Sequence, residues 1–183
     1  MSANAEMISL PHIPNLSVEQ AILVTVRAAQ QAMHALGSAQ RESVYESAMS
    51  KTLFYQNIPF LTQCPTRKRA APGISAATGP ADMFIAGSLV VELKAGHSRI
   101  RREHIDQVMR YYASIAEEHK EVRDNELVAM VINFKRGADV VQLWDSRRQI
   151  VTSLHVDRSN ISPFALLGTP TEESAPIEYD DMQ

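Results

Sequence analysis

Residues 81–94 read Ala81-Asp82-Met83-Phe84-Ile85-Ala86-Gly87-Ser88-Leu89-Val90-Val91-Glu92-Leu93-Lys94. The apolar and β-branched residues on either side of the central glycine predict two short strands joined by a tight turn. Side chains alternate between the faces of a strand, so the second strand sorts its residues into two sets. One face carries Leu89, Val91 and Leu93, and the other carries Val90, Glu92 and Lys94. Because unpaired buried charges are costly, a carboxylate and an ammonium on one face, beside a strand with Asp82, predict a functional site.

The segment at the N-terminus is expected to be extended and then helical. Prolines among residues 1–16 predict the extended part, since proline lacks the N–H that a helix interior needs. Ser17, followed three residues later by Gln20, is a capping-box pattern. It predicts a helix that runs to about Leu36.

A second helix, expected over roughly residues 40–56, carries an acid in its apolar row. Tyr45, Met49 and Leu53 are spaced by four and fall on one face. Extending that row backwards by three positions reaches Glu42, where an apolar residue is expected. Glu42 is either a site residue or a solvated acid in the first turn, where the helix dipole favours negative charge.

A strand and a basic loop are expected between this helix and residue 81. Residues 58–64 predict the strand, and the Pro, Gly, Ala and Ser content of residues 65–79 predicts a mobile loop. The cluster Arg67-Lys68-Arg69 lies in this loop. It either contacts phosphate groups or is solvated like most charged loops.

A third helix is expected over about residues 100–122. Its buried stripe is predicted to be Ile105, Val108, Tyr112 and Ile115. Polar and aromatic residues flank that stripe at positions i, i+3 and i+7, namely His104, Gln107 and Tyr111. They form either a half-exposed margin or part of a site. Further basic residues precede and open this helix: Arg99, Arg101 and Arg102.

The remainder of the chain predicts a central strand and a hairpin. Residues 127–134 form a near-continuous apolar run, which is typical of a strand buried on both faces. Residues 140–144 and 149–155 are expected to pair through a turn at 145–148. The resulting order predicts an α/β fold, with helices on both faces of a mixed sheet.

Size and composition describe one soluble domain. Of the 183 residues, 45% are apolar and 21% are charged, and we expect a domain over residues 17–159 with an acidic tail over 160–183. No apolar run reaches the roughly 18 residues of a membrane span, and the N-terminus lacks a secretory pattern. The single cysteine, Cys64, excludes a disulfide framework. We therefore expect a reducing intracellular compartment, cytoplasmic or nucleus-like, rather than secretion.

The net charge of −3 is unevenly distributed. Residues 168–183 contain five acids and no Lys or Arg, which leaves 18 basic against 16 acidic residues in the rest of the chain. Local clusters matter more than net charge for binding phosphates, so the basic segments above, together with Arg147 and Arg148, are candidate nucleic-acid contacts. The acidic tail is expected to contact either these basic clusters or a basic partner.

Four ordered pieces between Leu36 and Phe134 match a known pattern. They are Leu36-Gly37 with Glu42-Ser43-Val44-Tyr45-Glu46-Ser47-Ala48, then Ala81-Asp82 with Val90-Val91-Glu92-Leu93-Lys94-Ala95, then His104-Ile105-Asp106-Gln107-Val108-Met109-Arg110-Tyr111-Tyr112, and finally Val131-Ile132-Asn133-Phe134. Together they resemble the GxxExxY family, a branch of the PD-(D/E)XK nuclease superfamily related to RecB-type and lambda-exonuclease-type nucleases. One departure is Ala39, where the family has a glycine three residues before the glutamate. This departure bears on how the helix begins and how Glu42 is aimed.

The resemblance implies a restriction-endonuclease-like αβββαβ core with an extra N-terminal helix and a C-terminal hairpin. It also implies metal-dependent hydrolysis of phosphodiester bonds in nucleic acid, with DNA favoured over RNA. Asp82, Glu92 and the Leu93 carbonyl would hold Mg²⁺ or Mn²⁺, hard ions that prefer oxygen ligands. Glu42 would join them directly or through water.

The remaining roles also follow from the resemblance. Lys94 would orient or deprotonate the attacking water, or neutralise developing charge. Gln107 and Tyr111 would position the phosphate or a carboxylate that binds the metal ion. The arginine and lysine clusters would hold the nucleic-acid backbone without reading bases.

Two other classes of function stay open at this point. One is a catalytically weak or inactive protein on the same fold that binds nucleic acid or has a structural role, because a fold does not fix a function. The other is an adaptor whose acidic tail binds a basic partner. The residues themselves do not distinguish endo- from exonuclease, or a monomer from a homo-oligomer.

Overall fold

The computed structural model describes residues 16–71, 74–118 and 127–157, without the side chains of residues 67–78 and 118. The extended segment predicted for residues 1–16, apart from Leu16, and the acidic tail predicted for residues 160–183 lie outside these residues. Secondary-structure elements follow the predicted order. They are α1 (Val18–Leu36), α2 (Glu42–Tyr55), β1 (Phe60–Ala71), β2 (Ile74–Ile85), β3 (Leu89–Lys94), α3 (Arg102–Glu118), β4 (Val128–Lys135), β5 (Val140–Asp145) and β6 (Val151–His155). Among these helices, none combines the length and the apolar character needed to cross a membrane.

The strands form one mixed sheet in the order β1-β2-β3-β4-β5-β6. Only β3 and β4 run parallel, with Leu89 opposite Val128 and Lys94 opposite Asn133, and the other neighbours are antiparallel. The helix α3 connects the two parallel strands, as such a pair requires. The α/β class and the mixed sheet predicted from the sequence are confirmed.

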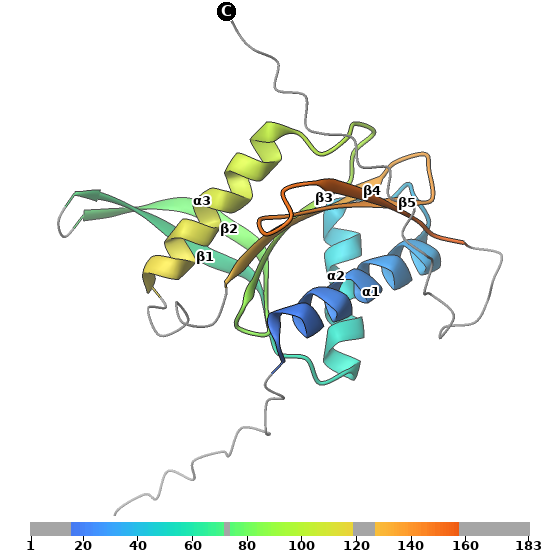
Figure 1. Ribbon diagram of the computed structural model, residues 1–183, viewed down its shortest axis with the longest axis horizontal. Helices are drawn as coiled ribbons and strands as arrows, with labels where there is room; N and C mark the ends of the chain where they lie inside the picture. The colour runs from blue at the N-terminus through green and yellow to red at the C-terminus, as the bar shows by residue number, and fades with distance from the viewer. Residues whose placement is uncertain (1–15, 72–73, 119–126, 158–183) are drawn as a thin grey trace, which may run out of the picture.

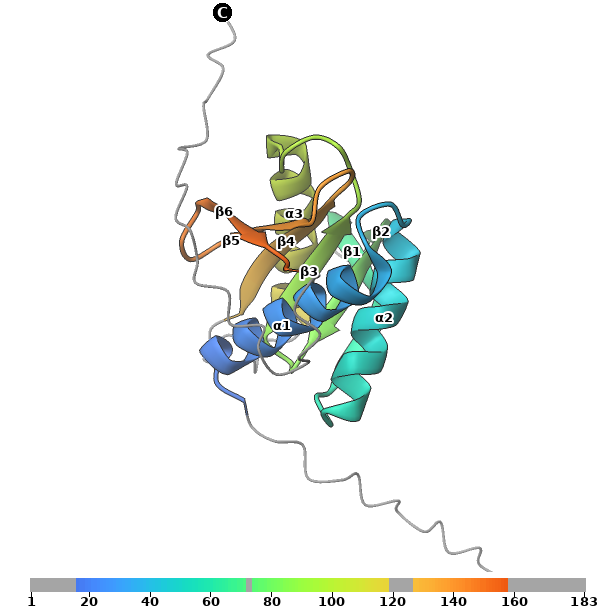
Figure 2. The same ribbon diagram turned by 90° about the vertical axis from the view of Figure 1, so that its right-hand side faces the viewer.

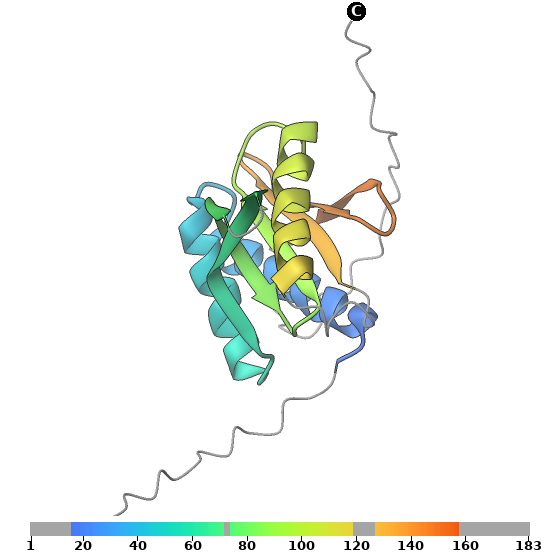
Figure 3. The same cartoon turned by 90° about the vertical axis from the view of Figure 1, so that its left-hand side faces the viewer.

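Helices cover both faces of this sheet. α1 and α2 lie on one face, and α3 lies on the other (Figures 1 and 3). Figure 2 shows α1 and α2 together beside the strands. Because both faces are covered, β4 is apolar and buried along nearly its whole length, as its sequence predicts.

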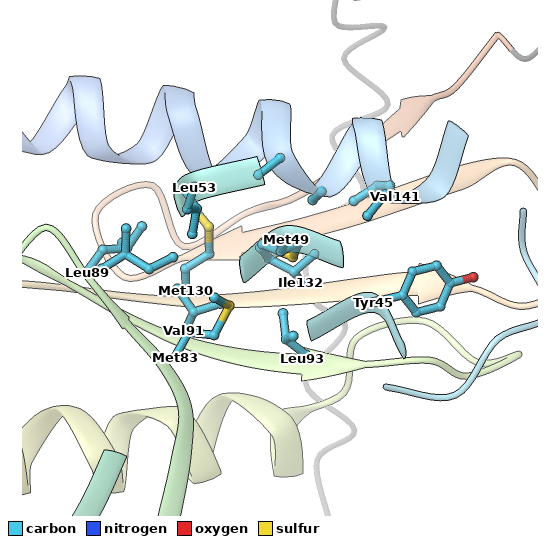
Figure 4. Close-up of a cluster of buried hydrophobic side chains, with 14 of the residues drawn as sticks. Tyr45, Met49, Leu53, Met83, Leu89, Val91, Leu93, Met130, Ile132 and Val141 are labelled. Atoms are coloured by element: carbon cyan, nitrogen blue, oxygen red, sulfur yellow. The ribbon is translucent and has the colours of Figure 1, made fainter. Parts of the chain in front are cut away.

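Alternation along β3 divides its residues between two apolar cores. Leu89, Val91 and Leu93 belong to the core under α1 and α2, which Figure 4 shows with Met49 and Leu53 of α2. Val90 belongs to the core under α3. The face assignment predicted for this strand is therefore correct, and the face with Val90 is the one that carries Glu92.

The start of α1 has the predicted capping box. Ser17 Oγ accepts a hydrogen bond from the Gln20 N–H at 3.3 Å, and Gln20 Oε1 accepts one from the Ser17 N–H at 2.9 Å. Two N–H groups that the helix leaves unsatisfied thereby gain acceptors.

The prediction of a loop over residues 65–79 is wrong. β1 and β2 continue through this segment as an antiparallel ribbon, with Pro65 opposite Pro80 and Arg69 opposite Ser75. β3 pairs with β2 only from Met83 onward, so the ribbon has two open edges. Proline at an open edge removes no ladder hydrogen bond, and backbone pairing outweighs the weak strand preference of Ala, Ser and Gly. In Figure 1 the ribbon extends away from the body of the molecule.

The predicted stripe of α3 is off by one position. Ile105, Val108 and Ile115 are buried as expected, but Tyr111 rather than Tyr112 completes the stripe, with 5% of its surface exposed. Tyr112 is half-buried beside it. Adjacent helical residues lie only about 100° apart, and either phase fits the spacing of the other three.

Candidate active site

Asp82, Glu92 and Lys94 meet on the α3 face of the sheet, around the end of β3. The Leu93 N–H donates a 2.7 Å hydrogen bond to Asp82 Oδ2, which ties the two strands together at the site. Lys94 Nζ donates to Glu92 Oε1, two residues earlier on the same strand. Glu92 is 2% exposed and Lys94 is 19% exposed, so this ion pair lies largely out of water.

Burial dominates the electrostatics of the two acids. Burial and, to a smaller extent, the neighbouring Asp82 carboxylate together raise the pKa of Glu92 to about 7, against the opposing effect of Lys94. Burial also raises the pKa of Asp82, although the Leu93 N–H and Lys94 pull it down. The second oxygen of Glu92, Oε2, is buried and accepts no hydrogen bond from any described residue. A buried carboxylate oxygen with no donor is suited to bind a cation.

Lys94 keeps its proton in this environment. Burial lowers its pKa, but the hydrogen bond to Glu92 and the charges of Glu92, Glu42 and Asp82 together outweigh burial and raise it. The ammonium is therefore positive at neutral pH. Of the roles predicted for Lys94, orienting water or neutralising negative charge suits a positive group better than removing a proton.

Glu42 reaches the same site from another layer of the fold. It is the first residue of α2, and its Oε1 accepts a 3.1 Å hydrogen bond from the Ala95 N–H, directly after β3. Its charge raises the pKa values of Asp82, Glu92 and Lys94. Glu42 is exposed, and its hydrogen bond to Ala95 holds it one residue beyond Lys94. The departure at Ala39 therefore does not prevent this contact.

Tyr45, three residues after Glu42, anchors the helix that carries it. Its ring stacks on Phe134 of β4 with centroids 3.9 Å apart and planes 3° apart, and its hydroxyl donates to the Gly37 carbonyl. Gly37 itself has a φ of 73°, a left-handed value that favours glycine, where α1 ends. The glycine and tyrosine of this segment thus fix where α2 starts.

Sequence reasoning missed two polar residues beside Asp82. Gln63 of β1 donates a 2.8 Å hydrogen bond to Glu46 of α2 and also interacts with Asp82, whose pKa it lowers. Burial raises the pKa of Glu46, and the charge of Asp82 raises it further. Gln63 has a left-handed φ of 49°, which costs a non-glycine residue roughly 1–2 kcal/mol. The spacing of Glu46 from Glu42, one helical turn, was the available signal.

On α3 the structure pairs Gln107 with Tyr111. The Gln107 amide donates to the Tyr111 hydroxyl at 3.0 Å, and that hydroxyl also lies close to Gly79, where an added Cβ would sit 3.6 Å from it. Neither group forms a side-chain hydrogen bond with Asp82, Glu92 or Lys94 in the described part of the chain. Of the trio predicted on this helix, His104 interacts electrostatically with the site. Burial has the largest effect in lowering the pKa of His104, and the charge of Lys94 lowers it as well.

A buried amide holds the chain that leaves β3. Asn133, opposite Lys94 on β4, is 1% exposed. Its Oδ1 accepts from the Gly96 N–H at 3.2 Å, and its Nδ2 donates to the Ser98 carbonyl at 2.9 Å and to Gln142 Oε1 at 3.1 Å. This network fixes the path of the backbone directly after Lys94 and was not predicted from the sequence.

These residues have the right chemical groups to bind a divalent cation, but their side chains are not arranged around a common point. Asp82, Glu92 and Glu42 supply carboxylate oxygens, and Glu92 Oε2 has no donor among the described residues. Across the described part of the chain, however, no three His, Cys, Asp or Glu side chains are gathered closely enough to enclose a metal ion. Glu92 Oε1, Asp82 Oδ2 and Glu42 Oε1 are instead occupied by Lys94, Leu93 and Ala95.

The predicted basic clusters differ in how they are placed. The backbone of Arg67, Lys68 and Arg69 lies in β1, and their side chains are not among those that the structure describes. Arg99 is exposed. Arg101 lies 3.6 Å from Glu103, and Arg102 forms a 2.9 Å ion pair with Asp106. Part of the predicted positive charge before α3 is therefore balanced by acids on the helix itself.

Comparison with known protein families produced a match over most of the chain. A family model described as the PD-(D/E)XK nuclease superfamily matches residues 19–143, which is more than half of the chain. A search of curated proteins and a search of solved structures found no match. The matched range spans α1 to β5 and contains every residue of the site described above.

Proposed function

Because the chain belongs to the PD-(D/E)XK nuclease superfamily, we propose that it is a divalent-metal-dependent nuclease that hydrolyses phosphodiester bonds, with DNA as the favoured substrate. The observation that carries this proposal is the gathering of Asp82, Glu92 and Lys94 at the end of β3, with Glu42 beside them. An acid pair can hold a divalent ion, and a charged lysine beside it can stabilise the negative charge that develops during phosphodiester hydrolysis.

The roles we assign follow the surroundings of each group. Asp82, Glu92 and the Leu93 carbonyl would hold Mg²⁺ or Mn²⁺, and Glu42 would join directly or through water. When bound, the ion supplies Lewis-acid activation of a phosphate oxygen and of water.

Lys94, positive and next to Glu92, stabilises the negative charge that develops on the phosphate. Asn133 fixes the backbone that follows Lys94 and so limits how far the lysine moves. Gln107 and Tyr111 line the same face from α3, and we assign them to contacts with the nucleic-acid backbone beyond the reacting phosphate.

The alternative of an inactive protein on this fold has no specific support. The carboxylates and the lysine are all present, and Gln63 holds a costly backbone conformation beside Asp82. Strain of that kind concentrates at functional sites.

A cleavage assay tests the proposal. Purified protein is incubated with circular and linear, single- and double-stranded DNA in Mg²⁺, in Mn²⁺ and in EDTA. We expect metal-dependent cleavage that Lys94→Ala slows by about 10²–10³-fold, because a preorganised charge on the reacting phosphate is lost. Lys51→Ala, which removes an exposed lysine from α2, is the matched control and should cut like the wild type. Cleavage by folded Lys94→Ala at the wild-type rate would show that the site is misassigned.

A further inference from the structure

Two arginines meet at an open pocket beside Glu42. Arg41 directly precedes α2, and Arg136 directly follows β4, where its N–H donates to the Gly96 carbonyl at 2.9 Å. The pocket has a volume of about 410 Å³ and is lined by Arg41, Glu42, Ser43, Ala95 and Arg136. Residues nearly a hundred positions apart are thus brought together next to the proposed catalytic end of β3.

Neither guanidinium is neutralised within the described part of the chain. No described carboxylate forms an ion pair with Arg41 or Arg136. This contrasts with Arg101, Arg102 and Arg147, which lie against Glu103, Asp106 and Glu19. The Nε of Arg136 is also buried and has no hydrogen-bond acceptor there. The pocket therefore presents two guanidinium groups that have no counter-ion among the described residues, and such groups attract an anion.

The chemistry of the pocket selects an oxyanion. Arginine presents a planar fork of donors that matches phosphate oxygens in pairs. The Glu42 carboxylate is held by the Ala95 N–H, and with two arginines the lining side chains keep a net positive charge. Arg41 offers the helix no side-chain cap, so the first turn of α2 faces the same pocket without a capping oxygen.

We propose that the Arg41–Arg136 pocket binds a phosphate group of the nucleic acid next to the phosphate that is cleaved. The inference rests on the proposed nuclease function and adds a subsite to it. Glu42 and Ala95 line the pocket, and Ala95 directly follows Lys94 at the end of β3, so the two phosphate positions adjoin. The bound group is either an internal diester or the terminal phosphate of a strand, and both present the same oxygens.

Binding of fluorescent DNA in EDTA tests the subsite without requiring cleavage. We expect Arg41→Ala and Arg136→Ala each to weaken binding about tenfold and to reduce the salt dependence of log K by about one unit. Arg27→Ala is the matched control. Arg27 is exposed on α1, belongs to none of the predicted basic clusters and does not line the pocket, so its loss should leave affinity unchanged. Arg136→Lys keeps the charge and serves if Arg136→Ala does not fold; it should weaken binding less but measurably, since the paired donors are lost.

Two substrate arms distinguish the source of the phosphate. If the terminal phosphate is bound, dephosphorylated linear DNA binds the wild type as weakly as phosphorylated DNA binds the variants. If an internal diester is bound, the variants lose affinity for circular single-stranded DNA to the same extent. Wild-type affinity of both variants in both arms, with the wild type binding DNA, would overturn the subsite and leave the nuclease proposal standing. Absence of DNA binding by the wild type would overturn both.

Discussion

The Ala95 N–H donates a 3.1 Å hydrogen bond to Glu42, which joins the first residue of α2 to the residue directly after β3. The bond links two layers of the fold, 53 positions apart in the chain. It places a third carboxylate near Asp82 and Glu92, and it leaves that carboxylate exposed enough to meet a substrate. The position of α2 therefore controls the charge of the site.

Replacing Glu42 should affect activity more than stability. Glu42→Gln keeps an oxygen for the Ala95 N–H and removes the charge, and we expect folded protein with cleavage slowed roughly 10–100-fold, the usual effect of losing a supporting group at a metal site. Glu42→Ala should slow cleavage at least as much. Melting temperatures and cleavage rates of both variants provide the measurement. Cleavage by Glu42→Gln at the wild-type rate would mean that Glu42 is only a solvated helix-end acid.

Stability of the metal-free protein should fall as pH rises. The pKa of Glu92 is about 7 in the folded protein and near 4.5 in the unfolded chain, so folding favours the protonated acid. The contribution of Glu92 is therefore complete below about pH 4.5 and is lost as pH rises through 7. Urea unfolding in EDTA between pH 5 and 8 measures it, with Glu92→Gln as the control whose stability should change less over that range. If the wild type loses no stability relative to Glu92→Gln over this pH range, the pKa of Glu92 is not raised in the folded protein.

A divalent ion should stabilise the folded protein. The carboxylates lie together only when the chain is folded, so an ion that binds them stabilises by about 2.7 kcal/mol at a hundredfold excess over its Kd. For a domain of this size the melting temperature should rise by roughly 5–10 °C. Mg²⁺, Mn²⁺ and Ca²⁺ are each expected to act, and Glu92→Gln should lose most of the response. Thermal scans that do not change with millimolar ion would show that these acids form no metal site.

Tyr45 should matter for stability rather than for metal binding. Its ring is fully buried against Phe134, and its hydroxyl bonds to the Gly37 carbonyl. Tyr45→Phe should cost about 0.5–1.5 kcal/mol, the value of one hydrogen bond, and Tyr45→Ala about 3–5 kcal/mol. The Mg²⁺-induced rise in melting temperature should survive in Tyr45→Phe. Loss of that rise in a folded Tyr45→Phe protein would assign the hydroxyl to the site instead.

Asn133 should contribute to both stability and activity. Asn133→Ala removes three hydrogen bonds at a buried position and leaves the Gly96 N–H and the Ser98 carbonyl without this partner. We expect a loss of roughly 2–3 kcal/mol in the free energy of unfolding. Cleavage at a temperature where the variant is fully folded should also slow, because the backbone after Lys94 is released. A variant that is destabilised but cuts normally when folded would confine Asn133 to a structural role.

Patterns with a strong local period predicted most of the fold. The alternation along β3, the four-residue spacing of Tyr45, Met49 and Leu53, and the apolar run of β4 each have one low-energy way to be buried. Each is confirmed as an element of the expected type. The ribbon at 65–79 escaped prediction because its pairing comes from backbone hydrogen bonds, which residue preference reports poorly.

The parts of the site that escaped prediction depend on contacts between distant segments. Gln63 is recognisable only once β1 is known to lie beside Asp82 and Glu46. Arg41 and Arg136 are ordinary charged residues in the sequence, and they form a pocket because the ends of α2 and β4 meet. The residue pattern within one element contains no information about contacts between distant segments. The charged face of β3 could be predicted because it depends on that strand alone.

The alternation along β3 also has a consequence for how this gene tolerates change. Odd-numbered residues from Leu89 to Leu93 fill one core, and even-numbered ones supply Glu92 and Lys94 to the site. A point mutation disturbs one of these functions at a time. Deletion or insertion of a single codon within β3 would exchange the two faces beyond that point, placing charge in the core and leucine at the site. In-frame length variation among descendants of this sequence should therefore be absent from β3.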